Sequence, residues 1–209
     1  MIKWKYIGGF MIDLFIIILS YFIGSLTWGI IITKYIKKRD VREKDFAGSA
    51  GVSRQFGLLT GVTVGVLDGL KGILVIFLAT TFGKSDLTII LSYIAMILGN
   101  NFPIYFNFKG GQGLAATLGA AIYVFPIETI ISVIVAACFI FLYVLLKLDK
   151  FIKFMGPIPF GAVFGFITMF IIVLNKYPFY PYQLLIIVAA FLLLSRGLMM
   201  ISYHKKRRN

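Results

Sequence analysis

Cysteine, histidine and acidic residues are scarce in this chain of 209 residues, which holds one cysteine, one histidine and eight acidic side chains. Cys138 has no second cysteine with which to form an intrachain disulfide. A metal centre ligated by Cys or His needs several such side chains, and Cys138 and His204 are the only two. The sequence therefore predicts no metal site.

Charged residues are also few, at 14% of the chain, whereas 60% of the residues are hydrophobic and the mean hydropathy is +0.95. Soluble domains average about 45–50% apolar and about 25% charged residues, so an ordinary soluble globule is excluded. The 21 phenylalanines exclude a disordered or nucleic-acid-binding tail protein. We expect an all-α integral membrane protein, with the lipid bilayer as its partner.

Long apolar runs predict about seven transmembrane helices in a single polytopic domain spanning residues 1–209, with six as the alternative. The first run is not followed by a small-residue cleavage site, and we interpret it as a retained span. The fourth run is short and adjoins Pro126, so it is either a short tilted span or a re-entrant segment. The runs cover residues 10–36, 58–82, 87–106, 114–125, 127–148, 158–174 and 184–203.

The net charge of +13 is distributed unevenly over the loops between these runs. One set of loops holds most of the Lys and Arg residues, including those of residues 34–54 and the tail 204–209. The other set holds only Lys3, Lys5, Lys84 and Lys176. Because positive loops stay inside, we predict an outside N-terminus, a cytoplasmic C-terminus and a basic cytoplasmic tail at 204–209.

A first candidate motif combines Gly24-Ser25 with the loop Asp40-Val41-Arg42 and the small-residue stretch 48–54, which contains Ser49 and Arg54. Loops of small residues expose backbone N–H groups, and a nearby Arg can hold a phosphate with two parallel hydrogen bonds. The alternative is a solvated basic loop that only sets topology.

A second motif places Asp68 and Lys71 inside an apolar run, three residues apart and so on one helix face. Ionisable groups within a span are costly and usually serve a function or pair with each other. The sequence is compatible with either a functional pair or a structural ion pair.

A third motif runs from Gly99-Asn100 through Phe102-Pro103 to Lys109-Gly110-Gly111-Gln112-Gly113 and opens a short apolar helix. A glycine turn lets the backbone approach a ligand, and a helix N-terminus favours an anion. The alternative is a tight interhelical turn. All three motifs fall on the predicted cytoplasmic side, which favours a phosphate-bearing ligand.

Taken together, these motifs resemble those of the bacterial acyl-phosphate:glycerol-3-phosphate acyltransferase family (PlsY type). Residues 99–119 are similar to its Gly-His-x-Phe-Pro…Lys-Gly-Gly-Lys-Gly-Val-Ala-Thr block, and Asp68-x-x-Lys71-Gly72 matches a second signature. Gly24-Ser25 and Asp40-Val41-Arg42 are similar to its Gly-Ser and Asp-Ile-Arg. Gly48-Ser49 aligns with either the Gly-Ser or the Gly-Ala of a further family block.

The chain departs from the family pattern at several positions. Asn100 stands where the family has His, and Gln112 stands where it has a Lys. The serines expected after the fifth span are absent around residues 151–159. Near the C-terminus only Arg196-Gly197 corresponds to the family's Arg-His-x-x-Asn-Ile.

The resemblance implies acyl transfer from acyl phosphate to glycerol 3-phosphate, giving lysophosphatidic acid in a bacterial plasma membrane without any cofactor. Proton removal is expected to rest on a substrate phosphate oxygen or on Asp68. The alternatives are a catalytically impaired relative that binds lipid or a phosphorylated ligand, and a small transporter. The resemblance assigns catalysis to Ser25, Arg42 and Asp68, and substrate binding to Ser49, Arg54, Lys71, Asn100, Lys109, Gly110, Gly111, Gln112 and Gly113.

Overall fold

The structure is a computed structural model that describes residues 2–152 and 156–208. Within these ranges every regular element is a helix, in agreement with the predicted all-α fold. The chain divides into two compact units, Met1–Val124 and Phe125–Asn209.

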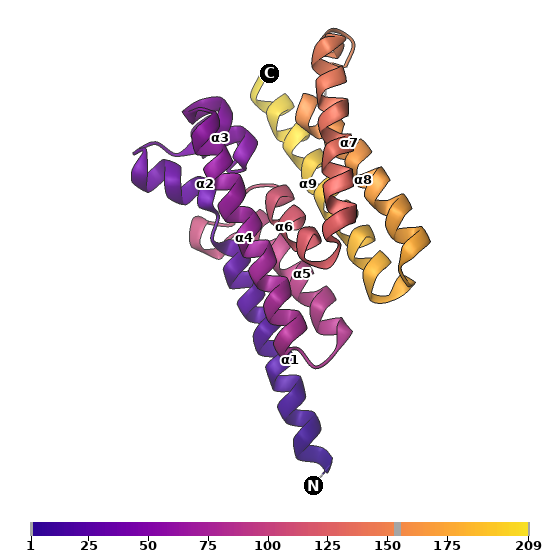
Figure 1. Ribbon diagram of the computed structural model, residues 1–209. Helices are drawn as coiled ribbons and strands as arrows, with labels where there is room; N and C mark the ends of the chain where they lie inside the picture. The colour runs from indigo at the N-terminus through magenta and orange to yellow at the C-terminus, as the bar shows by residue number, and fades with distance from the viewer. Residues whose placement is uncertain (1, 153–155, 209) are drawn as a thin grey trace. The chain divides into compact units, whose positions relative to one another are not determined.

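The first unit is built on three long helices, with shorter elements that carry the polar motifs. Helix α1 packs against α5, and α4 packs against α1, α5 and α6 (Figure 1). The elements are α1 (Ile2–Ser25), α2 (Trp28–Ile31), the π-helical turn η1 (Ile32–Ile36), the 3₁₀ turn η2 (Val41–Glu43), α3 (Ser49–Phe56), α4 (Leu58–Phe82), α5 (Asp86–Asn101), the 3₁₀ turn η3 (Ile104–Phe106) and α6 (Leu114–Val124).

The boundaries of α5 follow local sequence signals. The hydroxyl of Ser85 accepts a hydrogen bond from the backbone N–H of Thr88, and Asp86 lies in the first turn, where a negative charge is favourable. The helix ends at Asn101, two residues before Pro103, because the residue preceding a proline avoids the helical region.

The first apolar run is broken, whereas the sequence predicts one continuous span over residues 10–36. Helix α1 ends at Ser25 and α2 begins at Trp28, so Leu26 and Thr27 lie outside both helices. A break at membrane depth leaves carbonyl groups without helical partners, and lipid offers none. Another part of the protein must therefore supply hydrogen-bond donors at this point.

Close crossings between helices explain the placement of four glycines. A Cβ atom on Gly24 would collide with the carbonyl of Met96, and one on Gly99 would collide with α1. In the same way, a Cβ on Gly72 would collide with the carbonyl of Ala116, and one on Gly119 would collide with α4. These glycines let α1 approach α5, and α4 approach α6, at backbone contact distance.

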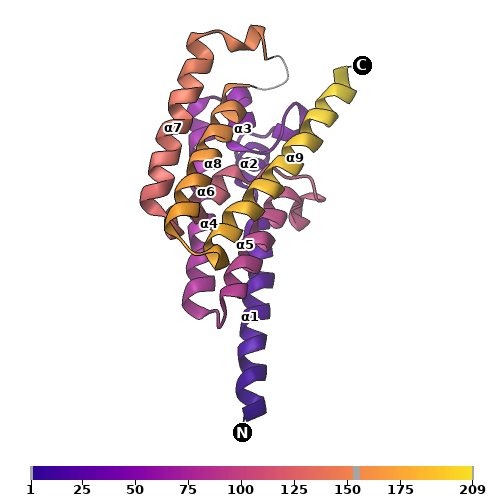
Figure 2. The same cartoon turned by 90° about the vertical axis from the view of Figure 1, so that its right-hand side faces the viewer.

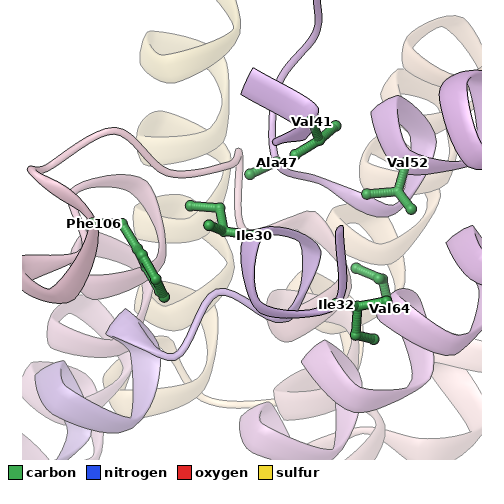
Figure 3. Packing of buried hydrophobic residues seen from close by; sticks show 7 residues of the cluster. All are labelled: Ile30, Ile32, Val41, Ala47, Val52, Val64 and Phe106. Carbon is green, nitrogen blue, oxygen red and sulfur yellow. The ribbon is translucent and has the colours of Figure 1, made fainter. Parts of the chain in front are cut away.

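A buried apolar cluster fastens the loop-borne elements to α4 (Figure 3). Its members come from α2, η1, η2, α3, α4 and η3 and from the segment before α3, so residues far apart in sequence share one core. They are Ile30, Ile32, Val41, Ala47, Val52, Val64 and Phe106. The cluster gives the polar loops around it a fixed apolar base.

The second unit consists of three long helices, two of which pack closely against each other. Figure 2 shows α7 and α8 running side by side, and the rings of Phe139 and Phe164 stack between them with centroids 3.7 Å apart. At one end of this pair, Lys176 forms an ion pair with the buried Glu128, and the hydroxyl of Tyr177 donates to the same carboxylate at 3.1 Å. The elements are α7 (Pro126–Leu145), the 3₁₀ turn η4 (Leu148–Lys150), α8 (Pro157–Lys176), the π-helical turn η5 (Phe179–Gln183) and α9 (Leu184–Arg208).

Among the described residues, six segments are long and apolar enough to cross a membrane, so the chain is a multi-pass membrane protein. They are Gly8–Ile36, Leu58–Phe82, Asp86–Phe106, Pro126–Leu145, Pro157–Lys176 and Phe179–Gly197. The remaining apolar helix, α6, has 11 residues. At about 1.5 Å per residue it is roughly half as long as a bilayer core is thick. The predicted count of seven therefore requires α6 to cross.

We expect Gly72→Ala to lower the free energy of unfolding by about 1–3 kcal/mol, because the new methyl group must push apart the α4 and α6 backbones. The matched control is Gly69→Ala on the same helix, where the nearest atom to the new Cβ lies 3.7 Å away. That variant should be unchanged or slightly stabilised, since Ala favours a helix. Thermal unfolding in detergent measures both, and equal stability of the two variants would contradict the close crossing.

Candidate active site

The ammonium group of Lys71 is the centre of the polar cluster in the first unit. Its side chain is 4% exposed in the middle of α4. The Nζ atom donates hydrogen bonds to the carbonyl oxygens of Gly24 and Leu26, both at 3.0 Å, and to Oδ1 of Asn100. An ammonium has three protons, so these three acceptors use its full donor capacity. Lys71 thereby satisfies the carbonyls exposed by the break after α1.

Asp68 interacts with the chain on the other side of the same break, at the start of α2. Its carboxylate lies 2.9 Å from Lys71 Nζ, which confirms that the two side chains share a helix face. The carboxylate also interacts electrostatically with the backbone N–H of Trp28, the first residue of α2. The pair on α4 therefore binds the end of α1 with its cation and the start of α2 with its anion, each matching the local helix dipole.

Ser25 lies at the end of α1, directly beside this pair, and is fully buried. Its hydroxyl donates to the carbonyl of Tyr21 at 2.9 Å. The hydroxyl of Tyr21 in turn donates to the carbonyl of Phe102 at 2.8 Å, which ties α1 to the end of α5. Asn100 contacts Lys71 directly from α5, and Ser25 lies at the end of α1 between the two residues whose carbonyls bind Lys71.

The glycine motif forms a compact turn against the end of α5. The N–H groups of Gly110 and Gly111 donate to the carbonyls of Asn101 and Asn100 at 3.2 and 3.1 Å. The amide of Asn101, with its nitrogen facing the turn, donates to the carbonyls of Gly111 and Gln112 at 3.2 and 2.8 Å. A side chain on Gly110 would collide with the Asn100 carbonyl. The turn thus needs glycine for its close approach.

Gly113 completes the turn with φ +85°, a backbone conformation that glycine adopts most easily, and α6 begins at the next residue. The first N–H groups of a helix have no intrahelical partners and carry partial positive charge. The glycine turn and the start of α6 together form a backbone surface that can bind an anion.

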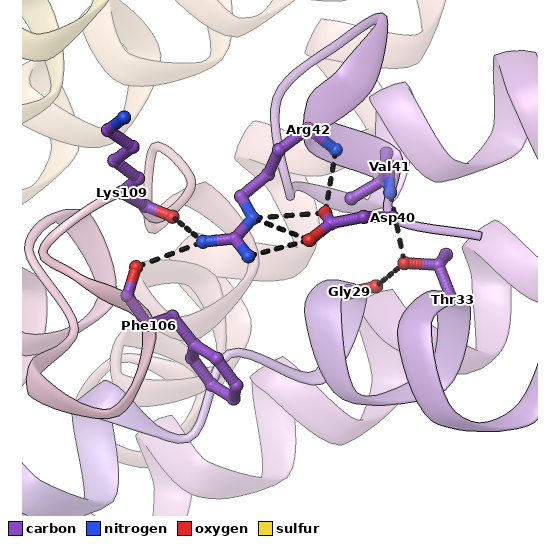
Figure 4. Close-up of polar contacts among 7 residues, drawn as sticks. All are labelled: Gly29, Thr33, Asp40, Val41, Arg42, Phe106 and Lys109. Carbon is purple, nitrogen blue, oxygen red and sulfur yellow. Dashed lines mark hydrogen bonds and ion pairs between the residues drawn. The ribbon is translucent and has the colours of Figure 1, made fainter. Parts of the chain in front are cut away.

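Arg42 braces this turn from the neighbouring loop (Figure 4). Its guanidinium forms a two-pronged ion pair with Asp40, with Nη2 2.6 Å from Oδ2 and Nε 2.9 Å from Oδ1. Its Nη1 donates to the carbonyl of Phe106 at 2.9 Å and to that of Lys109 at 3.5 Å. Partial burial raises the pKa of the Asp40 carboxyl, but the hydrogen bonds and charge of Arg42 outweigh burial and hold it below its usual value.

The small-residue stretch also reaches the glycine turn. A Cβ on Gly111 would lie 3.4 Å from the backbone nitrogen of Gly48, and Ser49 faces α4 at Gly65. Thus the loop of residues 40–49, the α4 pair and the glycine motif, which lie far apart in sequence, meet in one place. The three motifs therefore lie close together in the fold.

Two predicted binding residues stay outside this centre. Arg54 is 61% exposed and forms an ion pair with Asp45 at 2.7 Å. Lys109 has an exposed side chain, and its carbonyl is the group that contacts Arg42. Gln112 is half-buried on the turn itself.

The structure adds contributors that sequence reasoning missed. Asn101, which holds the glycine turn, follows Asn100 directly, and two adjacent asparagines at the end of an apolar run were the available signal. Trp28 acts through its backbone N–H, for which no sequence signal exists. Glu128, in the second unit, is also a charged residue inside an apolar run and could have been singled out by the same argument as Asp68, but its partners are Lys176 and Tyr177 of its own unit. Among the described residues, no three of His, Cys, Asp and Glu come together as a metal site.

The fold and this centre define a class: a multi-pass helical membrane protein with a buried Lys–Asp pair beside a glycine turn at a helix N-terminus. A family model described as glycerol-3-phosphate acyltransferase matches residues 14–208. The chain belongs to this family, of the PlsY type.

Relatives and solved structures agree with this membership. A glycerol-3-phosphate acyltransferase of Alkaliphilus metalliredigens is 33% identical over 152 residues, which cover 72% of this chain and 77% of the relative. One of Thermotoga petrophila is 42% identical over 104 residues, which cover 49% of this chain and about half (53%) of the relative. The crystal structure of PlsY (YgiH) in its glycerol 3-phosphate form has a TM-score of 0.74 and 28% identity, and the match covers 94% of each chain.

We expect Asp68→Asn to lower stability by about 3–5 kcal/mol, because it leaves the buried Lys71 cation without its counter-charge. The matched control is Asp149→Asn, which removes an exposed carboxylate and should change stability by no more than about 0.5 kcal/mol. Melting temperatures in detergent measure both variants. If Asp68→Asn melts like the unmodified protein, the pair does not hold the α1 break.

Proposed function

We propose that this protein transfers an acyl group from acyl phosphate to glycerol 3-phosphate, forming lysophosphatidic acid at the cytoplasmic face of a bacterial plasma membrane. The observation that carries the proposal is the meeting of three remote motifs around the Lys71 ammonium and the glycine turn. The family's name and the names of its relatives specify glycerol 3-phosphate as the acceptor. Acyl phosphate, the donor, rests on the motif resemblance.

In this proposal the phosphate of glycerol 3-phosphate binds at residues 109–113 and the start of α6. Exposed Lys109 supplies a positive charge there, half-buried Gln112 supplies a neutral amide, and the first N–H groups of α6 point toward the bound anion. Ser49 borders the same turn through its neighbour Gly48. Arg54 lies further out, where we propose that it attracts the substrate by its charge.

Acyl transfer requires an attack by the acceptor hydroxyl on the carbonyl carbon of the donor. The new C–O bond forms as the bond from that carbon to the phosphate oxygen breaks, and the electron pair leaves with the phosphate. Backbone N–H groups at the start of α6, which have no intrahelical partners, would stabilise the negative charge on the carbonyl oxygen. The hydroxyl proton goes to an oxygen of the departing phosphate.

Asp68 is the alternative proton acceptor, but its side chain is 6% exposed and is committed to Lys71 and Trp28. We therefore propose that Asp68 and Lys71 act as positioning residues, because they hold the segments that carry Ser25 and Asn100. Arg42 has the same kind of role for the glycine turn, through the Phe106 and Lys109 carbonyls. Substrate contacts then come from the backbone and from the exposed cations.

The purified protein in detergent, given acyl phosphate and glycerol 3-phosphate, should release lysophosphatidic acid and inorganic phosphate in equal amounts. Omitting glycerol 3-phosphate provides the control for simple hydrolysis of the donor. Asn100 and Gln112 differ from the family pattern, and this favours an impaired, ligand-binding relative as the second candidate. Absence of transfer, together with thermal stabilisation by glycerol 3-phosphate, would select that candidate instead.

Gln112→Lys should tighten binding of glycerol 3-phosphate by roughly one to two powers of ten. A lysine there adds an ammonium beside a helix N-terminus, and a hydrogen bond to a charged group contributes about 1.5–3 kcal/mol. Gln112→Met is the matched control, with similar length and no charge, and should not tighten binding. Calorimetry or thermal shift against ligand concentration gives the affinities. An unchanged affinity of the Lys variant would mean that the turn does not hold the phosphate.

A further inference from the structure

A second cationic feature lies outside the Lys71 centre, where the loop before η2 meets the end of α3. It is a pocket of about 290 Å³ lined by Arg39, Lys44, Arg54, Gln55 and Phe56. Three of these five side chains are cations, and nothing in the acyl-transfer proposal uses Arg39 or Lys44. We call this feature the basic pocket.

Two lining residues of the basic pocket, Gln55 and Phe56, are fixed by contacts with the rest of the unit, and the pocket carries an excess of positive charge. The amide of Gln55 donates to the carbonyl of Val41 at 2.9 Å, and Phe56 packs against the buried apolar cluster. Asp45 is bound to Arg54. The nearby Asp40 is bound to Arg42. Arg39 and Lys44 are exposed, so an anion that enters the pocket meets them directly, and two of the three carboxylates in residues 39–45 are engaged by Arg42 and Arg54.

In the sequence, exposed apolar side chains lie just before the first residue and just after the last residue that line the basic pocket. Leu58 and Leu59 follow Phe56 at the start of α4 and are 75% and 81% exposed. Tyr35 and Ile36 precede Arg39 at the end of η1 and are also exposed. The first and second membrane-spanning segments end and begin at these residues. Cations at the end of a span, beside apolar side chains that face lipid, match a ligand with a charged head and acyl chains.

We propose that the basic pocket binds the phosphate group of an anionic phospholipid, whose acyl chains lie along the exposed start of α4. Its phosphate accepts charge-assisted hydrogen bonds from Arg39 and Lys44, and Arg54 contributes its charge from its ion pair with Asp45. This site is separate from the glycine turn and does not depend on acyl transfer. Helix α3 runs from Ser49, near the glycine turn, to Arg54 in the basic pocket, so the two sites share one short element.

The test is native mass spectrometry of the protein released from mixed micelles with equal amounts of phosphatidylglycerol and phosphatidylcholine. The unmodified protein should retain phosphatidylglycerol in clear excess. The double variant Arg39→Gln/Lys44→Gln should reduce this preference about thirtyfold, because each basic residue near an anionic lipid surface contributes about a factor of five. Phosphatidylcholine retention should not change.

The matched control is Lys37→Gln/Lys38→Gln, which removes the same charge from the same segment at residues that do not line the basic pocket. It should keep the lipid preference. An equal loss in both double variants would show general surface attraction and overturn the proposal. In a second arm, millimolar inorganic phosphate replaces phosphatidylglycerol and should shift the melting temperatures of the unmodified protein and of Arg39→Gln/Lys44→Gln equally, through the glycine turn alone. If phosphate alone stabilises the unmodified protein and not Arg39→Gln/Lys44→Gln, the site serves a soluble anion, and the lipid assignment is wrong.

Discussion

One buried cation organises the first unit of this protein. The Lys71 ammonium donates to the two carbonyls freed by the break after α1 and to the Asn100 side chain, and it lies against the Asp68 carboxylate. An unpartnered charge or carbonyl at this depth would be costly, so each group needs the others. The break places Gly24-Ser25 beside α4 and directs the chain into the loop that carries Arg42. The architecture of the site therefore depends on this set of contacts.

Close helix crossings make those contacts possible. Gly24 and Gly99 let α1 and α5 approach each other, and Gly72 and Gly119 do the same for α4 and α6. Each of these glycines lies within one or two residues of a polar group of the site or on the helix that the glycine turn opens. Without such close approach, the Lys71 side chain could not reach both α1 and α5. These four glycines are therefore needed both for helix packing and for the hydrogen bonds of the site.

Much of the fold could be predicted because its signals are local. Apolar runs and charge-poor stretches indicated the helices, Pro126 marked the boundary between two of them, and the i,i+3 spacing of Asp68 and Lys71 placed both side chains on one helix face. The break at Leu26 and Thr27 was not predicted, because both residues lie in an apolar run and Lys71, 45 residues away from Leu26, supplies the missing donors. Asn101 was missed for a similar reason, since its role depends on the turn folding back onto α5.

The sequence by itself determined the class of protein, the helical content, the presence of a charged pair within a span and the family to which its motifs point. These follow from composition, hydrophobic runs and short spacings, which act on neighbouring residues. Only the tertiary structure decided which groups are committed to one another. It showed Lys71 fully engaged, Arg42 serving as a brace, and Arg54 displaced to an outer pocket with Arg39 and Lys44. Such assignments depend on long-range hydrogen bonds and on burial, which arise only when distant segments are packed together.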